Sequence, residues 1–130
     1  MVRTMEPRNN GRILAAELVG TLVLMLGGPG VAILLPSLGL LAEGDASTGA
    51  GLVRILIIAL GFGFSLMIMA YVIGPISGCH INPAVTLGML LARKVDLTQA
   101  VYSWIGQVVG AIGGASIIFG IASGRDGFQR

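Results

Sequence analysis

The residues Ile76-Ser77-Gly78-Cys79-His80-Ile81-Asn82-Pro83-Ala84-Val85-Thr86 stand in the middle of the chain, directly after a long apolar run. A segment suited to lipid gives way here to a glycine-containing turn and then to an Asn-Pro pair, which favours the start of a helix. Irregular backbone at membrane depth is tolerated only where protein buries it or where it lines a water-filled cavity. This stretch therefore predicts a pore or a permeation site.

The composition is typical of an integral membrane protein. Of the 130 residues, 55% are hydrophobic and only 11% are charged, where a soluble domain has about 25% charged residues. The single cysteine excludes an intrachain disulfide. No nucleophile–base pair, carboxylate pair or metal-ligand spacing is present, so we expect no enzyme, no cofactor and no metal. The small net charge of +2 gives no indication of nucleic-acid binding.

Three apolar runs predict membrane-spanning helices at residues 13–35, 52–73 and 97–122. The first would form roughly 35 Å of helix, which is enough to cross a bilayer. We expect Gly74-Pro75 to end the second run, because proline disfavours helical geometry in the residue before it. Polar tails at residues 1–12 and 123–130 flank the predicted membrane region.

Residues 74–92 do not form a full span. They hold the turn and a short helix from Pro83 to about Ala92, whose length of roughly 15 Å is half the hydrocarbon core. The predicted fold class is therefore an all-α membrane protein with three transmembrane helices and one re-entrant half-helix.

The distribution of basic residues predicts the orientation, because cytoplasmic loops carry an excess of Lys and Arg. One side of the membrane would carry five basic residues: Arg3, Arg8, Arg12, Arg93 and Lys94. The other side would carry three: Arg54, Arg125 and Arg130. We expect the N-terminus in the cytoplasm, with a bias modest enough to permit some inverted insertion.

The third span contains Gly106, Gly110 and Gly114 at four-residue spacing. Small residues at this spacing let two helix backbones approach closely in lipid. We favour a packing surface, although glycines without any such role are also common in membrane helices.

Asn82 and Pro83 suit the first positions of the short helix, as N-cap and first helical residue. The helix would begin near the membrane centre, with its positive dipole end facing a cavity. The carbonyls of the four preceding residues, Gly78 to Ile81, cannot all find helical partners. Acceptors that lead to a central amide donor suit an uncharged hydrogen-bonding solute such as water.

The same residues carry a family resemblance. Ser77-Gly78-x-His80-x-Asn82-Pro83-Ala84-Val85-Thr86 resembles the first signature loop of the aquaporin (major intrinsic protein) family. Three further stretches resemble that family's first span, third span and following loop, the last as in bacterial water-selective members: Ala15-Ala16-Glu17-x-x-Gly20-Thr21, Gln107-Val108-Val109-Gly110 and Ala122-Ser123-Gly124-x-x-Gly127-Phe128. The resemblance implies one of the two inverted repeats of a six-span fold.

The resemblance also implies roles for individual residues. Asn82, Pro83 and Ala84 match the central pore motif, and the backbone carbonyls of Gly78, Cys79, His80 and Ile81 match the ladder that leads to it. Phe62 matches the aromatic residue of the outer selectivity filter, and phenylalanine at this position favours water over glycerol. A phenylalanine that merely packs or faces lipid is the alternative for Phe62.

Two further residues, Glu17 and Cys79, have more than one interpretation, and His80 has one. By resemblance Glu17 organises the re-entrant loop, although a charge at the membrane interface or a proton-coupling site is also consistent with its position. His80 would brace the loop while its carbonyl faces the pore. Cys79 is either a target for mercurials that block conduction or a buried small hydrophobic residue.

One re-entrant segment cannot close an aquaporin pore, which needs two inverted halves. Two copies in opposite orientations, or a partner protein, would complete a channel for water or small glycerol-like solutes. The sequence is also consistent with a non-conducting fragment of a longer gene. A small proton-coupled exporter that uses Glu17 is a further hypothesis. In each case we expect a protein surrounded by lipid, in the inner membrane of a bacterial cell.

Overall fold

The computed structural model describes residues 9–37 and 49–124, and all regular structure in these ranges is helical. The elements in chain order are α1 (Asn10–Met25), η1 (Leu26–Gly30), α2 (Val31–Ser37), α3 (Gly49–Ser77), α4 (Pro83–Leu91) and α5 (Leu97–Ser123). Three helical segments are long and apolar enough to cross a membrane: Asn10–Pro36, α3 and α5. The predicted all-α fold with three spanning helices is confirmed.

The first span is one continuous rod made of α1, η1 and α2. Asn9 caps its start, because the side-chain oxygen accepts a hydrogen bond from the Arg12 N–H at 3.2 Å. The π-helical segment η1 contains Pro29 between Gly28 and Gly30. Proline lacks an N–H and its ring clashes with the carbonyl four residues earlier, and a locally widened turn relieves that clash.

The second span continues past the point where we expected it to end. Gly74 and Pro75 lie inside the last turns of α3, which reaches Ser77. The steric conflict before a proline involves the Cβ of the preceding residue, and Gly74 has none. The helix also keeps a later backbone bond, from the Gly78 N–H to the Gly74 carbonyl at 3.0 Å. The expected end at residue 73 was therefore wrong.

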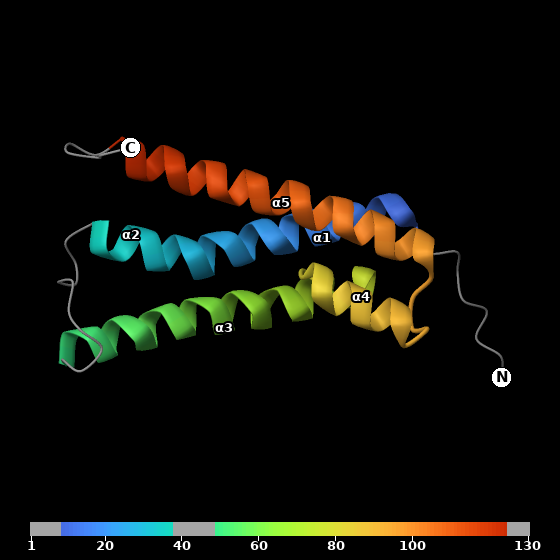
Figure 1. Cartoon of the computed structure of the whole chain (residues 1–130), viewed down its shortest axis with the longest axis horizontal. Helices are drawn as coiled ribbons and strands as arrows, with labels where there is room; N and C mark the ends of the chain where they lie inside the picture. Colours follow the sequence, from blue (N-terminus) through green and yellow to red (C-terminus); the bar gives the residue numbers. More distant parts are fainter. Residues whose placement is uncertain (1–8, 38–48, 125–130) are drawn as a thin grey trace.

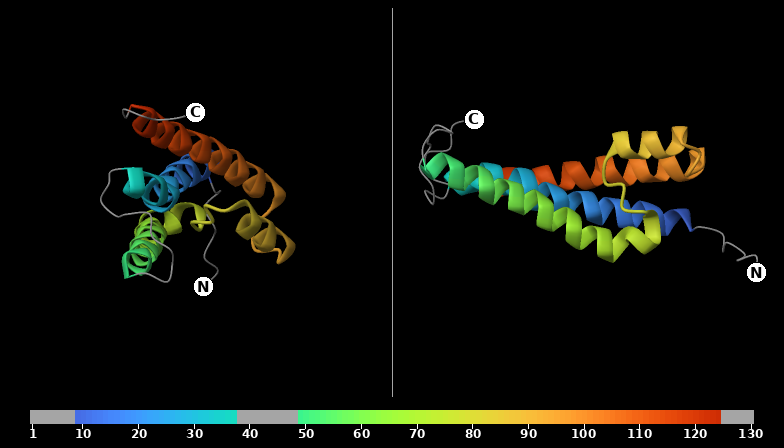
Figure 2. Two further views of the ribbon diagram at one scale, coloured as in Figure 1. Left: turned by 60° about the vertical axis from the view of Figure 1, so that its left-hand side comes forward. Right: turned by 90° about the horizontal axis from the view of Figure 1, so that it is seen from below.

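The first span lies between the other two. Figure 1 shows α1 and α2 in the middle, with α5 along one side and α3 along the other. The short helix α4 packs on α5. In the right-hand view of Figure 2, the chain after α3 turns back along the bundle before α4 runs toward the end at which α3 finished. This re-entrant path is what positions the candidate site.

The glycines of α5 form the contact with α1. A Cβ on Gly106 would lie 2.5 Å from the Leu14 carbonyl oxygen, and one on Gly110 would collide with the Leu18 carbonyl. On Gly114 it would lie 2.6 Å from the Cβ of Met25. Because two of these neighbours are backbone atoms that cannot rotate away, the two helices approach as closely as they do only with glycine at these positions.

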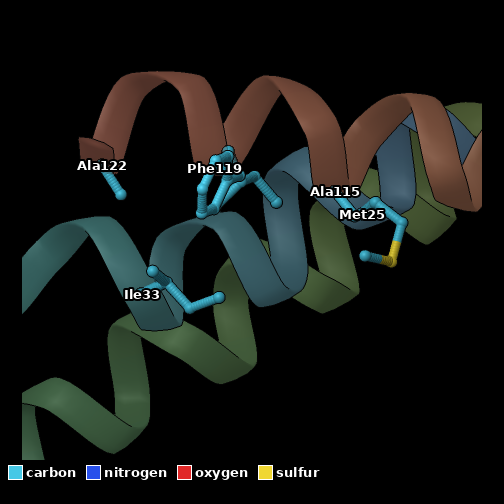
Figure 3. Close-up of a pocket in the computed structure, with 6 residues that line it drawn as sticks. Met25, Ile33, Ala115, Phe119 and Ala122 are labelled. Carbon is cyan, nitrogen blue, oxygen red and sulfur yellow. The ribbon is translucent and has the colours of Figure 1, made fainter. Parts of the chain in front are cut away.

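An apolar pocket lies beyond this contact, toward the ends of α2 and α5. Its lining comes from α1, α2 and α5, and Figure 3 shows the side chains of Met25, Ile33 and Phe119 around it. The volume is about 190 Å³, and no charged residue lines it.

We predict that Gly110→Ala lowers the stability of the fold. The added methyl group would push α5 away from the Leu18 carbonyl, and overpacking of this kind costs about 1–3 kcal/mol. Gly120→Ala is the matched control, because a Cβ there meets nothing within 4 Å. Thermal unfolding in detergent, followed by circular dichroism, should show a lower midpoint for Gly110→Ala only. Equal midpoints for the two variants would contradict the close contact.

Candidate functional site

The candidate site is the irregular segment between α3 and α4, residues 78–82. Three of its residues have positive φ angles: 92° at Gly78, 52° at Cys79 and 36° at Ile81. Glycine adopts such angles freely, but a residue with a side chain held there costs on the order of 1–3 kcal/mol. The two strained residues therefore need neighbours that hold the segment in place.

The carboxylate of Glu17 provides that support. Glu17 is fully buried in α1 and accepts hydrogen bonds from two loop amides, the His80 N–H at 2.9 Å and the Ile81 N–H at 2.6 Å. It also accepts from the Ser77 hydroxyl at 2.6 Å and from the Gln107 amide at 2.7 Å. All four partners donate, which is the set of partners that an ionised carboxylate binds best.

The N–H groups of the loop donate to side chains inside the protein, and its carbonyl oxygens do not take part in these bonds. The Cys79 N–H donates to the Ser77 hydroxyl at 3.1 Å, so three successive amides point at buried side chains. Within residues 9–37 and 49–124, no hydrogen bond is made to the carbonyl oxygens of Gly78, Cys79, His80 or Ile81. The carbonyl oxygens of these four residues are therefore unused hydrogen-bond acceptors within the described part of the chain.

His80 braces the loop through its side chain. Its Nδ1 lies 3.1 Å from the Thr86 hydroxyl oxygen. That hydroxyl also lies 3.2 Å from the Asn82 carbonyl oxygen, to which it can donate, and it accepts from the Gln107 amide at 2.9 Å. Which of the two side chains donates in the His80–Thr86 contact depends on the tautomer of His80.

The start of α4 is fixed by a cap and by a contact from α5. The side-chain oxygen of Asn82 accepts from the Ala84 N–H at 2.9 Å, and Pro83 occupies the first helical position. The Trp104 indole N–H donates to the Pro83 carbonyl at 3.1 Å. Because the cap uses the oxygen of the Asn82 amide, its NH₂ group is left to donate elsewhere.

The structure does not bring Phe62 to this loop. The Phe62 ring packs directly over Gly28 in η1, where even a Cβ on that glycine would collide with it, and the side chain is 40% exposed. Along α3 it is fifteen residues from Ser77, or about 22 Å of helix. Cys79, in contrast, lies within the loop and is half-buried.

Polar residues of α5 complete the site, a role that we did not expect for them from the sequence. Gln99, Ser103 and Gln107 are buried at four-residue spacing, which places them on one face of an apolar helix. The Gln107 amide donates hydrogen bonds to Glu17 and Thr86, and Gln99 donates to the Ser77 carbonyl at 3.5 Å. Polar side chains repeated at helical spacing within a membrane span were the available signal.

Comparison of the sequence with known proteins identifies the family. Residues 4–129 match the family model described as major intrinsic protein. The chain belongs to the major intrinsic protein family. Membership, together with the three long apolar helices, makes it an integral membrane protein.

Several members of the family are similar in sequence. Aquaporin Z of Brucella melitensis biotype 1 is 43% identical over 116 residues, which are 89% of this chain and 46% of that protein. Aquaporin Z of Rhodopseudomonas palustris is 43% identical over 88% of this chain and 43% of its own length. Aquaporin-5 of Sus scrofa is 39% identical over 85% of this chain and 37% of its own length. The chain spans less than half the length of these relatives.

The surroundings of Glu17 disfavour the hypothesis of a proton-coupled exporter. A proton-coupling carboxylate must exchange its proton with water and with a substrate site. Glu17 has no exposed surface, and all four of its hydrogen bonds come from donors. A proton on either oxygen would displace one of these donors. In this member of the major intrinsic protein family, the carboxylate holds backbone in place.

We predict that Glu17→Gln loosens the loop. The new amide NH₂ would face either the two donors on Oε1, from Ser77 and His80, or the two donors on Oε2, from Ile81 and Gln107. Leaving a buried donor unpaired costs about 1–3 kcal/mol. The measurement is the rate at which a water-soluble maleimide alkylates Cys79, which should rise several-fold. Ser116→Ala is the control, because the exposed Ser116 hydroxyl bonds only its own helix at Ile112. Unchanged alkylation in Glu17→Gln would refute the role of the carboxylate.

Proposed function

We propose that this chain forms one half of a passive transmembrane channel for water, open also to small neutral solutes. The observation that supports this most directly is the unpaired row of carbonyls from Gly78 to Ile81, which leads to the capped start of α4. The resemblance of the same residues to the aquaporin loop points to the same role.

In this proposal Asn82, Pro83 and Ala84 form the centre of the pore. A water molecule leaving the Ile81 carbonyl would meet the free NH₂ of Asn82, which donates to its oxygen. The first N–H groups of α4 add a positive dipole end at the same point, and this repels cations. A path that presents acceptors and then a donor conducts an uncharged molecule that can both donate and accept hydrogen bonds.

Phe62 is proposed as the filter residue of this half. Its ring is partly exposed and packed on Gly28, so the close contact with η1 limits the directions in which it can move. A large, fixed aromatic side chain narrows a pore and favours water over glycerol. Comparison of water and glycerol flux through the same sample tests this preference.

The second half would come from another copy in the opposite orientation or from a partner protein. Asn82, Pro83 and Ala84 are exposed, and only 11% of the apolar window of α3 is buried. These surfaces are available to a second half. A second half would also shield the carbonyls of Gly78 to Ile81 and the Asn82 amide from lipid, where each unsatisfied polar group costs several kcal/mol. We place the N-terminus in the cytoplasm and the channel in a bacterial inner membrane.

We predict that proteoliposomes with only this chain shrink faster than empty liposomes in stopped-flow light scattering. Asn82→Asp should abolish the difference, because it replaces the donating NH₂ with an acceptor. Gly120→Ala, at a lipid-exposed position far from the loop, is the control and should conduct normally. Flux that survives Asn82→Asp would refute the proposed pore. No flux from the unchanged chain would refute completion by a second copy and leave completion by a partner.

We predict that mercurials inhibit this flux through Cys79. The thiol lies on the loop, three residues before Asn82, and is half-buried. A bound mercury atom there would obstruct the row of carbonyls. Cys79→Ser should conduct water and resist inhibition. Equal responses of the two proteins to mercurial would show that the thiol does not reach the water path.

A further inference from the structure

The first span and α3, which run side by side in Figure 1, touch backbone to backbone at the level of η1. A Cβ added to Gly61 would collide with the Gly27 carbonyl, and one added to Gly27 would overlap the Ser65 side chain. The Ser65 hydroxyl donates to the Gly61 carbonyl at 2.7 Å, which holds it in this contact. The two helices therefore cannot come closer, and moving them apart would break a contact that small residues make possible.

Gly28, the next residue of η1, differs from these glycines in what lies beside it. The three atoms nearest to a Cβ added there all belong to the Phe62 ring. Cδ1 would lie 2.5 Å away and Cζ 2.6 Å away, with Cε1 between them in the ring and closer still. The space left by the missing side chain of the buried Gly28 is therefore filled by an aromatic ring and not by the backbone of α3.

This contact restricts the Phe62 ring on one side only. Three consecutive ring atoms lie over Gly28, yet the residue is 40% exposed. A phenylalanine side chain moves about two torsion angles, so η1 blocks movement toward the first span and leaves movement away from it open. How far the ring stands out from the helices is then set by the backbone at Gly28.

The backbone at this point is itself irregular. Gly28 lies in the π-helical segment Leu26–Gly30 and is followed by Pro29. Single π-helical turns inside α-helices occur frequently at functional sites. Here the irregular turn lies at the level of the residue that the proposed function assigns to the selectivity filter.

We propose that Gly28 is a positioning residue that sets the width of the channel at Phe62. This inference rests on the proposed function, in which the exposed side of the ring borders the path of the solute. To reach an ordinary carbon–carbon contact of about 3.5–4.0 Å with an added Cβ, the ring would have to move by about 1 Å or more. That movement is away from η1 and into the path. Pore diameter is one of the properties that determine which neutral solutes pass.

The first measurement is the flux of water and of glycerol through proteoliposomes that contain the full chain. Gly28→Ala should lower the flux of water several-fold, and Phe62→Ala should raise the flux of glycerol. The variant with both changes should conduct like Phe62→Ala alone, because the new methyl group then has no ring to displace. Gly63→Ala is the matched control, since a Cβ beside Phe62 at that position meets nothing within 4 Å in the described part of the chain.

The second measurement is the thermal unfolding midpoint of the same variants in detergent, which does not require conduction. Gly28→Ala should lower the midpoint by several degrees, because the ring is either strained or moved off η1. The loss should be clearly smaller when Phe62 is already alanine. The midpoints also show whether each variant is folded at the temperature of the flux measurement.

The two measurements separate failure of this inference from failure of the proposed function. Water flux that Gly28→Ala leaves unchanged, or lowers equally with and without the Phe62 ring, would overturn the positioning role. Equal losses of midpoint in the two backgrounds would also overturn it. If the unchanged chain conducts no water, the channel completed by a second copy fails instead, and the midpoints still decide whether Gly28 holds the ring.

Discussion

The fold of the re-entrant loop depends on one buried carboxylate. Glu17 receives four hydrogen bonds, two from loop amides, one from the end of α3 and one from α5. These bonds offset the strain of Cys79 and Ile81, whose positive φ angles no helix or sheet would stabilise. Because the amides point at Glu17, the opposite side of each peptide faces away from it. The direction of the loop carbonyls is thus a result of where the carboxylate lies.

The same carboxylate connects α1 to both of the other long helices. α1 contributes Glu17, α3 contributes Ser77, and α5 contributes Gln107, which also bonds Thr86 at the start of α4. Hydrogen bonds between helices in lipid are worth only about 1 kcal/mol each. The glycine contact of α5 with α1 supplies the close approach that lets Gln107 reach Glu17, so packing and polar bonding depend on each other here.

Much of this arrangement could be predicted from the sequence, because hydropathy and the Asn-Pro start are local signals. The three spans and the short helix after Asn82 follow directly from them. The end of the second span could not be predicted from Pro75 alone, since the absence of a Cβ on Gly74 changes the outcome. The contacts of Trp104 with Pro83 and of Phe62 with Gly28 depend on how the helices lie side by side, which no local pattern encodes.

The wide sequence separation of the Glu17 contacts has a consequence for biosynthesis. Glu17 is synthesised well before its partners, because Ser77, His80 and Ile81 follow it by 60, 63 and 64 residues. Gln107 arrives last, 90 residues after Glu17. Until α5 has been made, Glu17 lacks one of its four donors, and Thr86 lacks the Gln107 amide that donates to its hydroxyl. The contacts that surround the loop are therefore complete only after α5 has been synthesised, even though the loop lies in the middle of the sequence.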